Sequence, residues 1–126
     1  ACTDITGFGL LGHGVEMAEA SEVTLELKVG RVPYFADAVD YAKMGLVPAG
    51  AYKNRGDSIG KVDDGGAAEH YLDLLYDPQT SGGLLISVSP KDLDQMMADF
   101  AATDMDTAVA VIGDVKEKSD KLIRLV

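Results

Sequence analysis

The chain has 126 residues, of which 11 are Lys or Arg and 21 are Asp or Glu, so its formal net charge at pH 7 is −10. This length predicts one domain, and a composition of 47% hydrophobic and 25% charged residues excludes disordered, collagen-like and coiled-coil chains. The acidic balance argues against a nucleic-acid partner, because phosphate neutralisation needs clustered Lys and Arg. No apolar stretch approaches the roughly 18 residues of a membrane span and no signal peptide opens the chain, so we expect no membrane partner and a cytoplasmic location.

Hydrophobic periodicity predicts the elements of the first half. A helix is predicted from Phe8 to near Ser21, and the three glycines inside it predict a close approach by another element or a ligand. Strict alternation predicts a strand over Val23–Val29. A second helix is predicted to begin at Pro33. The segment Pro48–Gly66 has little apolar periodicity and five glycines, which predicts a long loop and a candidate site wall.

In the second half, a short helix is predicted over Ala67–Tyr76, a polar turn over Asp77–Gly83 and a strand over Leu84–Ser89. A longer helix is predicted to begin at Pro90. Two strands, Thr107–Val115 and Lys121–Val126, are predicted to form a closing antiparallel hairpin. In the longer helix, the residues predicted to face the core are Leu93, Met96, Met97 and Phe100. This order of elements predicts an α+β fold, with a sheet covered by helices in one 126-residue domain.

The segment Thr3–His13 places a carboxylate and two hydroxyls just ahead of the first helix. A helix N-terminus suits phosphate, and Asp4 is the hard oxygen donor that a Mg²⁺ ion bridging protein and substrate phosphates requires. We therefore regard Asp4 as a candidate metal ligand, with phosphate-site candidates at Thr3, Thr6, Gly7 and Gly9. The alternative is that one of these polar side chains merely caps the helix.

A second polar segment, Asp77–Gly83, contains a proline, two glycines that permit positive φ, and several hydrogen-bond donors. Such a loop can cradle an anion, which makes Thr80, Ser81, Gly82 and Gly83 further phosphate-site candidates. The alternative is a tight connection into a crowded strand.

Three basic residues, Lys43, Lys53 and Arg55, lie in the acid-free stretch between Tyr41 and Gly56, which indicates either a phosphate-facing surface or an ordinary solvated one. Two histidines are too few for a zinc site. A single Cys, Cys2, permits no internal disulfide; it is interpreted as a small buried residue, and the alternative is a reactive thiol at the phosphate site. No Ser-His-Asp or Cys-His arrangement is indicated.

Together, Ala1–His13 and Asp77–Leu85 closely resemble motifs of selenophosphate synthetase (selenide, water dikinase). Their spacing and the segment Ile112–Val115 extend the resemblance over essentially the whole chain, as the C-terminal domain of that enzyme. Because the chain begins without an initiator Met, we also expect a fragment of a longer protein. The resemblance implies a three-layer α/β/α domain with a mixed sheet, partly ferredoxin-like, as in the C-terminal domain of aminoimidazole ribonucleotide synthetase.

The resemblance also implies the reaction. Enzymes of this family convert ATP, selenide and water to selenophosphate, AMP and orthophosphate, with Mg²⁺ bridging carboxylates and ATP phosphates, and Asp4 matches one of the metal ligands. The family's catalytic Cys or selenocysteine and its Lys lie in an N-terminal domain, so no catalytic residue is expected here and the fragment alone is expected to be inactive. The full-length enzyme is expected to bind ATP and selenide and to form a homodimer.

One segment, Pro48–Arg55, departs from the family pattern. Asn54 and Arg55 are kept and become substrate-site candidates, whereas Ala49 and Ala51 replace a Gly and a hydroxyl residue, so the contact through that hydroxyl is lost. The alternatives are the equivalent domain of a related enzyme, of the aminoimidazole ribonucleotide synthetase, thiamine-monophosphate kinase or hydrogenase-maturation type, and a non-catalytic assembly domain.

Overall fold

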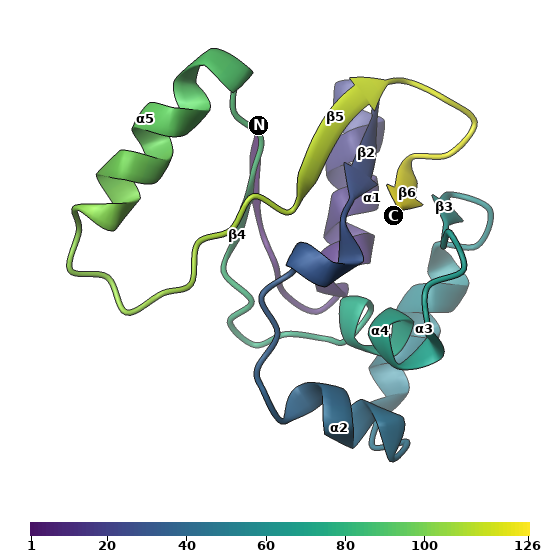
Figure 1. Cartoon of the computed structure of the whole chain (residues 1–126). Coiled ribbons are helices and arrows are strands. Elements are labelled where there is room, and N and C mark those ends of the chain that lie inside the picture. The colour runs from purple at the N-terminus through teal and green to yellow at the C-terminus, as the bar shows by residue number, and fades with distance from the viewer.

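The computed structural model describes residues 1–126 (Figure 1). Its strands are β1 (Cys2–Asp4), β2 (Val23–Leu27), β3 (Val62–Asp63), β4 (Leu84–Ile86), β5 (Gly113–Glu117) and β6 (Ile123–Leu125). Its helices are α1 (Gly9–Ser21), α2 (Ala38–Lys43), α3 (Ala49–Asp57), α4 (Glu69–Leu75) and α5 (Pro90–Ala101), with a 3₁₀ turn, η1, at Val29–Arg31. None of the helices combines the length and apolarity that crossing a bilayer requires.

The strands form two sheets. Strands β1 and β4 pair antiparallel, and the other four lie in the order β3, β6, β2, β5. In the larger sheet β2 runs parallel to β6 and antiparallel to β5, while β3 runs parallel to β6. The sheet is therefore mixed, which confirms an α+β fold with a mixed sheet.

The predicted closing hairpin is wrong in one respect. Strands β5 and β6 are consecutive in the chain, but they do not pair with each other, because β2 lies between them. Leu25 of β2 is opposite Val115 of β5 on one side and opposite Ile123 of β6 on the other. The predicted strand over Thr107–Val115 is also shorter, since β5 begins at Gly113. In the observed order β2 has a hydrogen-bonded strand on each side, so the backbone groups on both of its edges are paired. A hairpin of β5 with β6 alone would not pair them.

Helix α1 covers the larger sheet and confirms the predicted first helix. Its apolar face contributes Leu11, Val15 and Ala18 to the core, against strand residues such as Leu25. A Cβ atom at Gly14 would lie 3.0 Å from Ile123 Cδ1, so this glycine lets the helix approach the sheet closely. The glycines of this helix were predicted to mark a close approach by another element or by a ligand. For Gly14, the approaching element is the sheet.

The segment predicted as a long loop contains helix α3 and strand β3 instead. The buried positions of the α3 segment are Ala51, Asn54 and Ser58, which repeat at helical spacing but are small or polar. Tertiary contacts therefore stabilise a helix whose hydrophobic periodicity is weak. The neighbouring helix α2 begins at Ala38, later than the predicted start at Pro33.

Helix α5 starts with Pro90 at its first turn, as predicted, but it does not join the core. Figure 1 shows α5 standing apart from both sheets. Its four predicted core residues are only half-buried, and none of them belongs to the core cluster: Leu93, Met96, Met97 and Phe100. The amphipathic pattern correctly predicted the helix, whereas its position relative to the core is a matter of tertiary packing that the pattern does not determine.

Candidate metal and phosphate site

The two predicted motifs lie side by side in the smaller sheet (Figure 1). Asp4 in β1 is opposite Leu84 in β4. The ladder continues past the strands, because Ile5 N donates to Gly83 O at 2.9 Å and Gly82 N donates to Ile5 O at 3.0 Å. Segments that are about eighty residues apart in sequence are thereby fixed in one register.

Asp4 lies on the exposed face of this small sheet. Its neighbours Ile5 and Leu85 are buried on the other side, whereas Asp4 and Leu84 face solvent. The Asp4 carboxylate forms no ion pair or hydrogen bond within the chain, so both of its oxygens are available to a cation. No three His, Cys, Asp or Glu side chains gather into a metal site. A cation held by Asp4 would therefore need its other ligands from phosphates, water or another part of a longer protein, which fits Mg²⁺ chemistry.

Two candidate glycines are required by backbone packing between the motifs. Gly9 has φ +70°, and a Cβ atom there would lie 2.8 Å from the carbonyl carbon of Tyr76. A Cβ atom at Gly82 would lie 2.7 Å from Ile5 O. By contrast, Gly7 and Gly83 have open space where a side chain would stand. The tight-connection interpretation of the turn therefore accounts for Gly82, and the predicted close approach of another segment accounts for Gly9.

The turn Asp77–Gly83 is anchored at its first half and open at its second. Gln79 N donates to Thr6 O at 3.0 Å, and the Gln79 side-chain amide donates to the carboxylate of Asp77. Burial raises the pKa of Asp77, and the hydrogen bond from Gln79 acts in the opposite direction. Thr80 and Ser81 are exposed, and their hydroxyls form no hydrogen bond within the chain. These two hydroxyls remain available to a ligand.

Asn54 lies at the junction of the motifs. Its side chain is buried, and its Nδ2 atom donates to Gly7 O at 2.8 Å and to Tyr76 O at 3.0 Å. Both acceptors are backbone carbonyls beside the two motifs. The structure thus gives this predicted substrate residue a clear structural contact, which holds the loop before α1 against the end of α4.

The three basic residues of the acid-free stretch are all paired with acids outside it. Lys43 approaches Asp40, and Lys53 approaches Asp57 at 2.5 Å. Arg55 forms an ion pair with Glu69 of α4, and the hydrogen bond from its guanidinium to Glu69 raises the pKa of Arg55. A phosphate contact by Arg55 would have to compete with Glu69.

Sequence analysis missed a chain of side-chain hydrogen bonds within the first motif. The Thr6 Oγ1 atom lies 3.0 Å from His13 Nε2, and His13 Nδ1 lies 3.0 Å from Glu16 Oε2. His13 is 8% exposed, and the Phe8 ring packs against it with ring centroids 5.2 Å apart. The spacing of His13 and Glu16, three residues apart on one helix, was the available signal.

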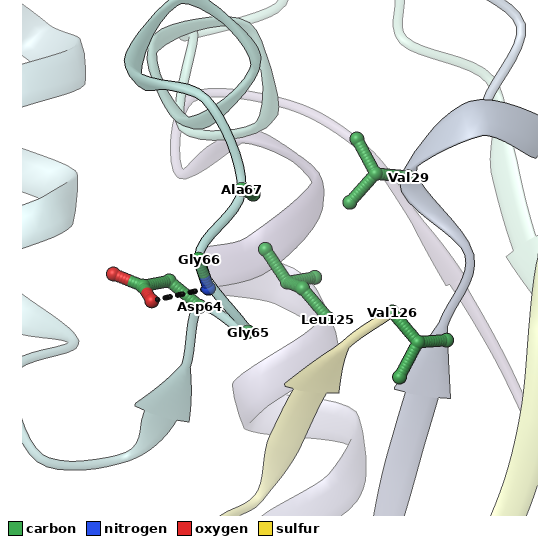
Figure 2. Close-up of a pocket in the computed structure, with 7 residues that line it drawn as sticks. All are labelled: Val29, Asp64, Gly65, Gly66, Ala67, Leu125 and Val126. Atoms are coloured by element: carbon green, nitrogen blue, oxygen red, sulfur yellow. Dashed lines mark hydrogen bonds between the residues drawn. The ribbon is translucent and has the colours of Figure 1, made fainter.

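Two hollows of the surface lie away from these residues. One of them, of about 140 Å³, lies between the loop after β3 and the C-terminus. Figure 2 shows the residues that line it, among which Asp64 accepts a hydrogen bond from Gly66 N at 3.0 Å. A second hollow of about 240 Å³ lies beside Met17, Val23 and Val115. None of the predicted site residues lines either hollow. Asp4, Thr80 and Ser81 are themselves exposed, so this part of the candidate site lies on the surface around β1, β4 and the turn before β4.

A mixed α+β domain with these paired motifs defines a recognisable class. Residues 1–125 match the family described as AIR synthase related protein, C-terminal domain, and the chain belongs to this family. It is 49% identical over 120 residues to a selenide, water dikinase of Pelobacter propionicus, covering 94% of this chain and 34% of that protein. It is 46% identical over 121 residues to selenide, water dikinase 2 of Peptoclostridium acidaminophilum, covering 96% of this chain and 35% of that protein.

A selenide, water dikinase of Clostridioides difficile is 47% identical over 122 residues, with 96% of this chain and 35% of that protein covered. The chain therefore spans about a third of the length of these relatives. These matches confirm the family resemblance that the two motifs indicated.

Proposed function

We propose that this chain is the C-terminal domain of a selenide, water dikinase that makes selenophosphate, AMP and orthophosphate from ATP, selenide and water. The observation that carries the proposal is the pairing of β1 with β4, which brings the exposed carboxylate of Asp4 next to the Asp77–Gly83 turn. The names of the similar proteins support the same reaction.

In this proposal the domain supplies positioning and electrostatics. Asp4 would hold Mg²⁺ together with the phosphates of ATP, and the ion would neutralise phosphate charge during transfer. Thr80 and Ser81 donate hydrogen bonds to phosphate oxygens from the open half of their turn, and the free space at Gly7 and Gly83 admits the ligand close to the backbone. The carboxylate of Asp4 is exposed and unpaired, so it meets the cation without first breaking an internal contact.

The remaining parts of the enzyme lie outside this chain in our proposal. The catalytic Cys or selenocysteine and the catalytic Lys belong to an N-terminal domain, so the 126 residues alone do not turn over. We further propose a cytoplasmic homodimer for the full-length enzyme and, for this domain, the three-layer, partly ferredoxin-like arrangement that the resemblance implies.

The test is phosphorus NMR of the full-length enzyme with ATP, Mg²⁺ and selenide under anaerobic conditions. The proposal predicts resonances of selenophosphate, AMP and orthophosphate that grow together and depend on selenide. If ATP were consumed only with another substrate, the equivalent domain of a related enzyme would be indicated. If no nucleotide were consumed with any substrate of the superfamily, a non-catalytic assembly domain would be favoured.

A further inference from the structure

In the hydrogen-bond chain of Thr6, His13 and Glu16, the protonation of the His13 ring sets which atoms donate. The Glu16 carboxylate is an acceptor, so the neutral His13 ring must carry its proton on Nδ1 to donate across the 3.0 Å contact. The other ring nitrogen, Nε2, is then an acceptor. With His13 in this neutral form, Thr6 donates its only hydroxyl proton to Nε2 across the second 3.0 Å contact.

This direction determines what the Thr6 hydroxyl can offer to a ligand. With its proton directed to His13, Thr6 Oγ1 presents only lone pairs away from the ring. A phosphate oxygen, which is itself an acceptor, gains nothing from such a contact, whereas a cation or a water bound to a cation does. In this arrangement the hydroxyl does not donate to a phosphate oxygen.

The place of Thr6 in the chain brings this acceptor near Asp4. Ile5 is buried and hydrogen-bonded to Gly83, and alternate residues of an extended segment lie on the same side of it, so Asp4 and Thr6 flank Ile5 on the side away from the core. Thr6 O also accepts from Gln79 N and Gly9 N, which fixes the backbone of Thr6. Phe8 covers the imidazole and limits its rotation.

We propose that His13 and Glu16 are positioning residues that hold Thr6 Oγ1 as a hydrogen-bond acceptor toward the hydrated divalent cation of a metal–nucleotide complex, beside the carboxylate of Asp4. The inference rests on the proposed function for the identity of the ligand. Glu16 sets the tautomer of His13, His13 orients Thr6, and only Thr6 meets the water shell of the metal.

Two measurements on the full-length enzyme test this inference. Correlation spectra of the ring nitrogens, with His13 assigned by its loss in His13→Gln, report the tautomer without any turnover. Electron paramagnetic resonance of free Mn²⁺ reports binding of Mn²⁺ with ATP in the absence of selenide. We expect a proton on Nδ1 and a bare Nε2 in the native enzyme. A protonated Nε2, in either the other tautomer or the imidazolium, would overturn the inference.

The variants separate orientation from mere packing. Thr6→Val, which removes the hydroxyl at nearly constant shape, is expected to weaken Mn²⁺–ATP binding about tenfold, and Thr6→Ser is expected to retain it. Glu16→Lys replaces the exposed acceptor with a donor, so it is expected to move the His13 proton to Nε2 and to weaken binding similarly. Glu19→Lys, the same charge change one turn along α1, is the control. Native-like binding by Thr6→Val and Glu16→Lys would refute the inference.

The outcome is distinguishable from failure of the proposed function. If the tautomer and the Mn²⁺–ATP results are as expected but the native enzyme makes no selenophosphate, the dikinase assignment fails and the role of Thr6 stands for another ATP-using reaction. If selenophosphate forms but Thr6→Val binds Mn²⁺–ATP normally, only this inference fails.

Discussion

The buried amide of Asn54 connects segments that are 47 and 22 residues away along the chain, through its hydrogen bonds to Gly7 O and Tyr76 O. A buried carbonyl without a donor costs free energy, and the Asn54 side chain supplies the donor to the buried carbonyl of Tyr76. The Asn54 side chain therefore adds to the backbone contacts that hold the loop before α1 against the end of α4.

Asn54→Ala is expected to lower the free energy of unfolding by about 1–3 kcal/mol, because it removes two hydrogen bonds and leaves the buried Tyr76 carbonyl without its donor. Equilibrium urea unfolding of the chain measures the change. The neighbouring Lys53→Ala, which breaks only the exposed pair with Asp57, is the control and should change stability by less than about 1 kcal/mol. An Asn54→Ala effect as small as that of the control would contradict the bridging role.

Tyr34 makes stability depend on alkaline pH. Burial, with a contribution from Tyr71, raises the pKa of Tyr34 from 10.0 to about 12, and its hydroxyl donates to Val29 O at 3.3 Å. The folded chain thus keeps this proton to a higher pH than the unfolded chain does, so stability falls as pH rises from about 10 toward about 12.

Thermal unfolding of the native chain and of Tyr34→Phe at several pH values in this range checks the effect. The variant should lose less stability between the lowest and the highest pH, although the lost hydroxyl contact lowers its stability at neutral pH. Tyr52→Phe, at an exposed position, should show the slope of the native chain. Equal slopes for Tyr34→Phe and the native chain would show that Tyr34 is not the group responsible.

At the scale of elements, helix α3 packs against the candidate site through one of its small residues. Gly50 lies against the second motif, because a Cβ atom there would meet Pro78 Cγ at 2.5 Å. Gly56, near the other end of the same helix, has nothing within 4 Å of the corresponding position. Packing therefore requires a glycine at position 50 but not at position 56, a difference that the sequence alone does not show.

Substituting each of them by Ala gives opposite expected effects. Gly50→Ala should destabilise by about 1–3 kcal/mol, because the proline ring cannot rotate away from the new methyl group. Gly56→Ala should stabilise by about 0.5 kcal/mol, because it restricts the unfolded chain without a clash. Urea unfolding of the two variants side by side measures both. A stabilising Gly50→Ala would show that α3 does not pack on the turn.

The elements that the sequence predicted well are those with an apolar repeat. Helix α1 and strand β2 bury Leu11, Val15 and Leu25 at regular spacing, so their pattern is visible without a structure. Helix α3 buries Ala51, Asn54 and Ser58, and a search for hydrophobic periodicity does not register such residues. Strand β1 is three residues long, which is too short for alternation to be recognised.

The residues of the candidate site also divide into those that the sequence indicated and those whose role depends on tertiary contacts. The motifs themselves indicated Asp4 and the turn at Gly82, and the pairing of β1 with β4 brought them together. The contacts of Asn54 and the direction of the Thr6 and His13 hydrogen bond depend on tertiary structure. The pairing of Arg55 with Glu69 was equally invisible, because it joins residues of two different helices.

At the scale of the whole molecule, the packing is uneven. The core gathers around α1, both sheets and the nearby ends of α3 and α4, whereas α5 makes only sparse contact with other elements. Regions with few buried contacts open at low free energy cost and exchange their amide hydrogens quickly. The stability of α5 within this chain should therefore lie well below that of α1.

Hydrogen exchange of the chain tests this difference by mass spectrometry or NMR. Amides in the middle of α5, around Met96, are expected to exchange at least about a hundredfold faster than those in the middle of α1, around Val15. Helix length is not the cause, since α5 has 12 residues and α1 has 13. Equal protection of the two helices would contradict the uneven packing.

The central claim is that Asp4 is the metal ligand that this domain contributes to a phosphoryl-transferring enzyme. The most direct measurement compares selenophosphate formation, by phosphorus NMR at saturating Mg²⁺ and ATP, in the native full-length enzyme, Asp4→Asn and Asp104→Asn. Both variants lose one exposed carboxylate with little change of shape. We expect about a hundredfold loss of selenophosphate for Asp4→Asn and native activity for Asp104→Asn. Native activity of Asp4→Asn would contradict the account.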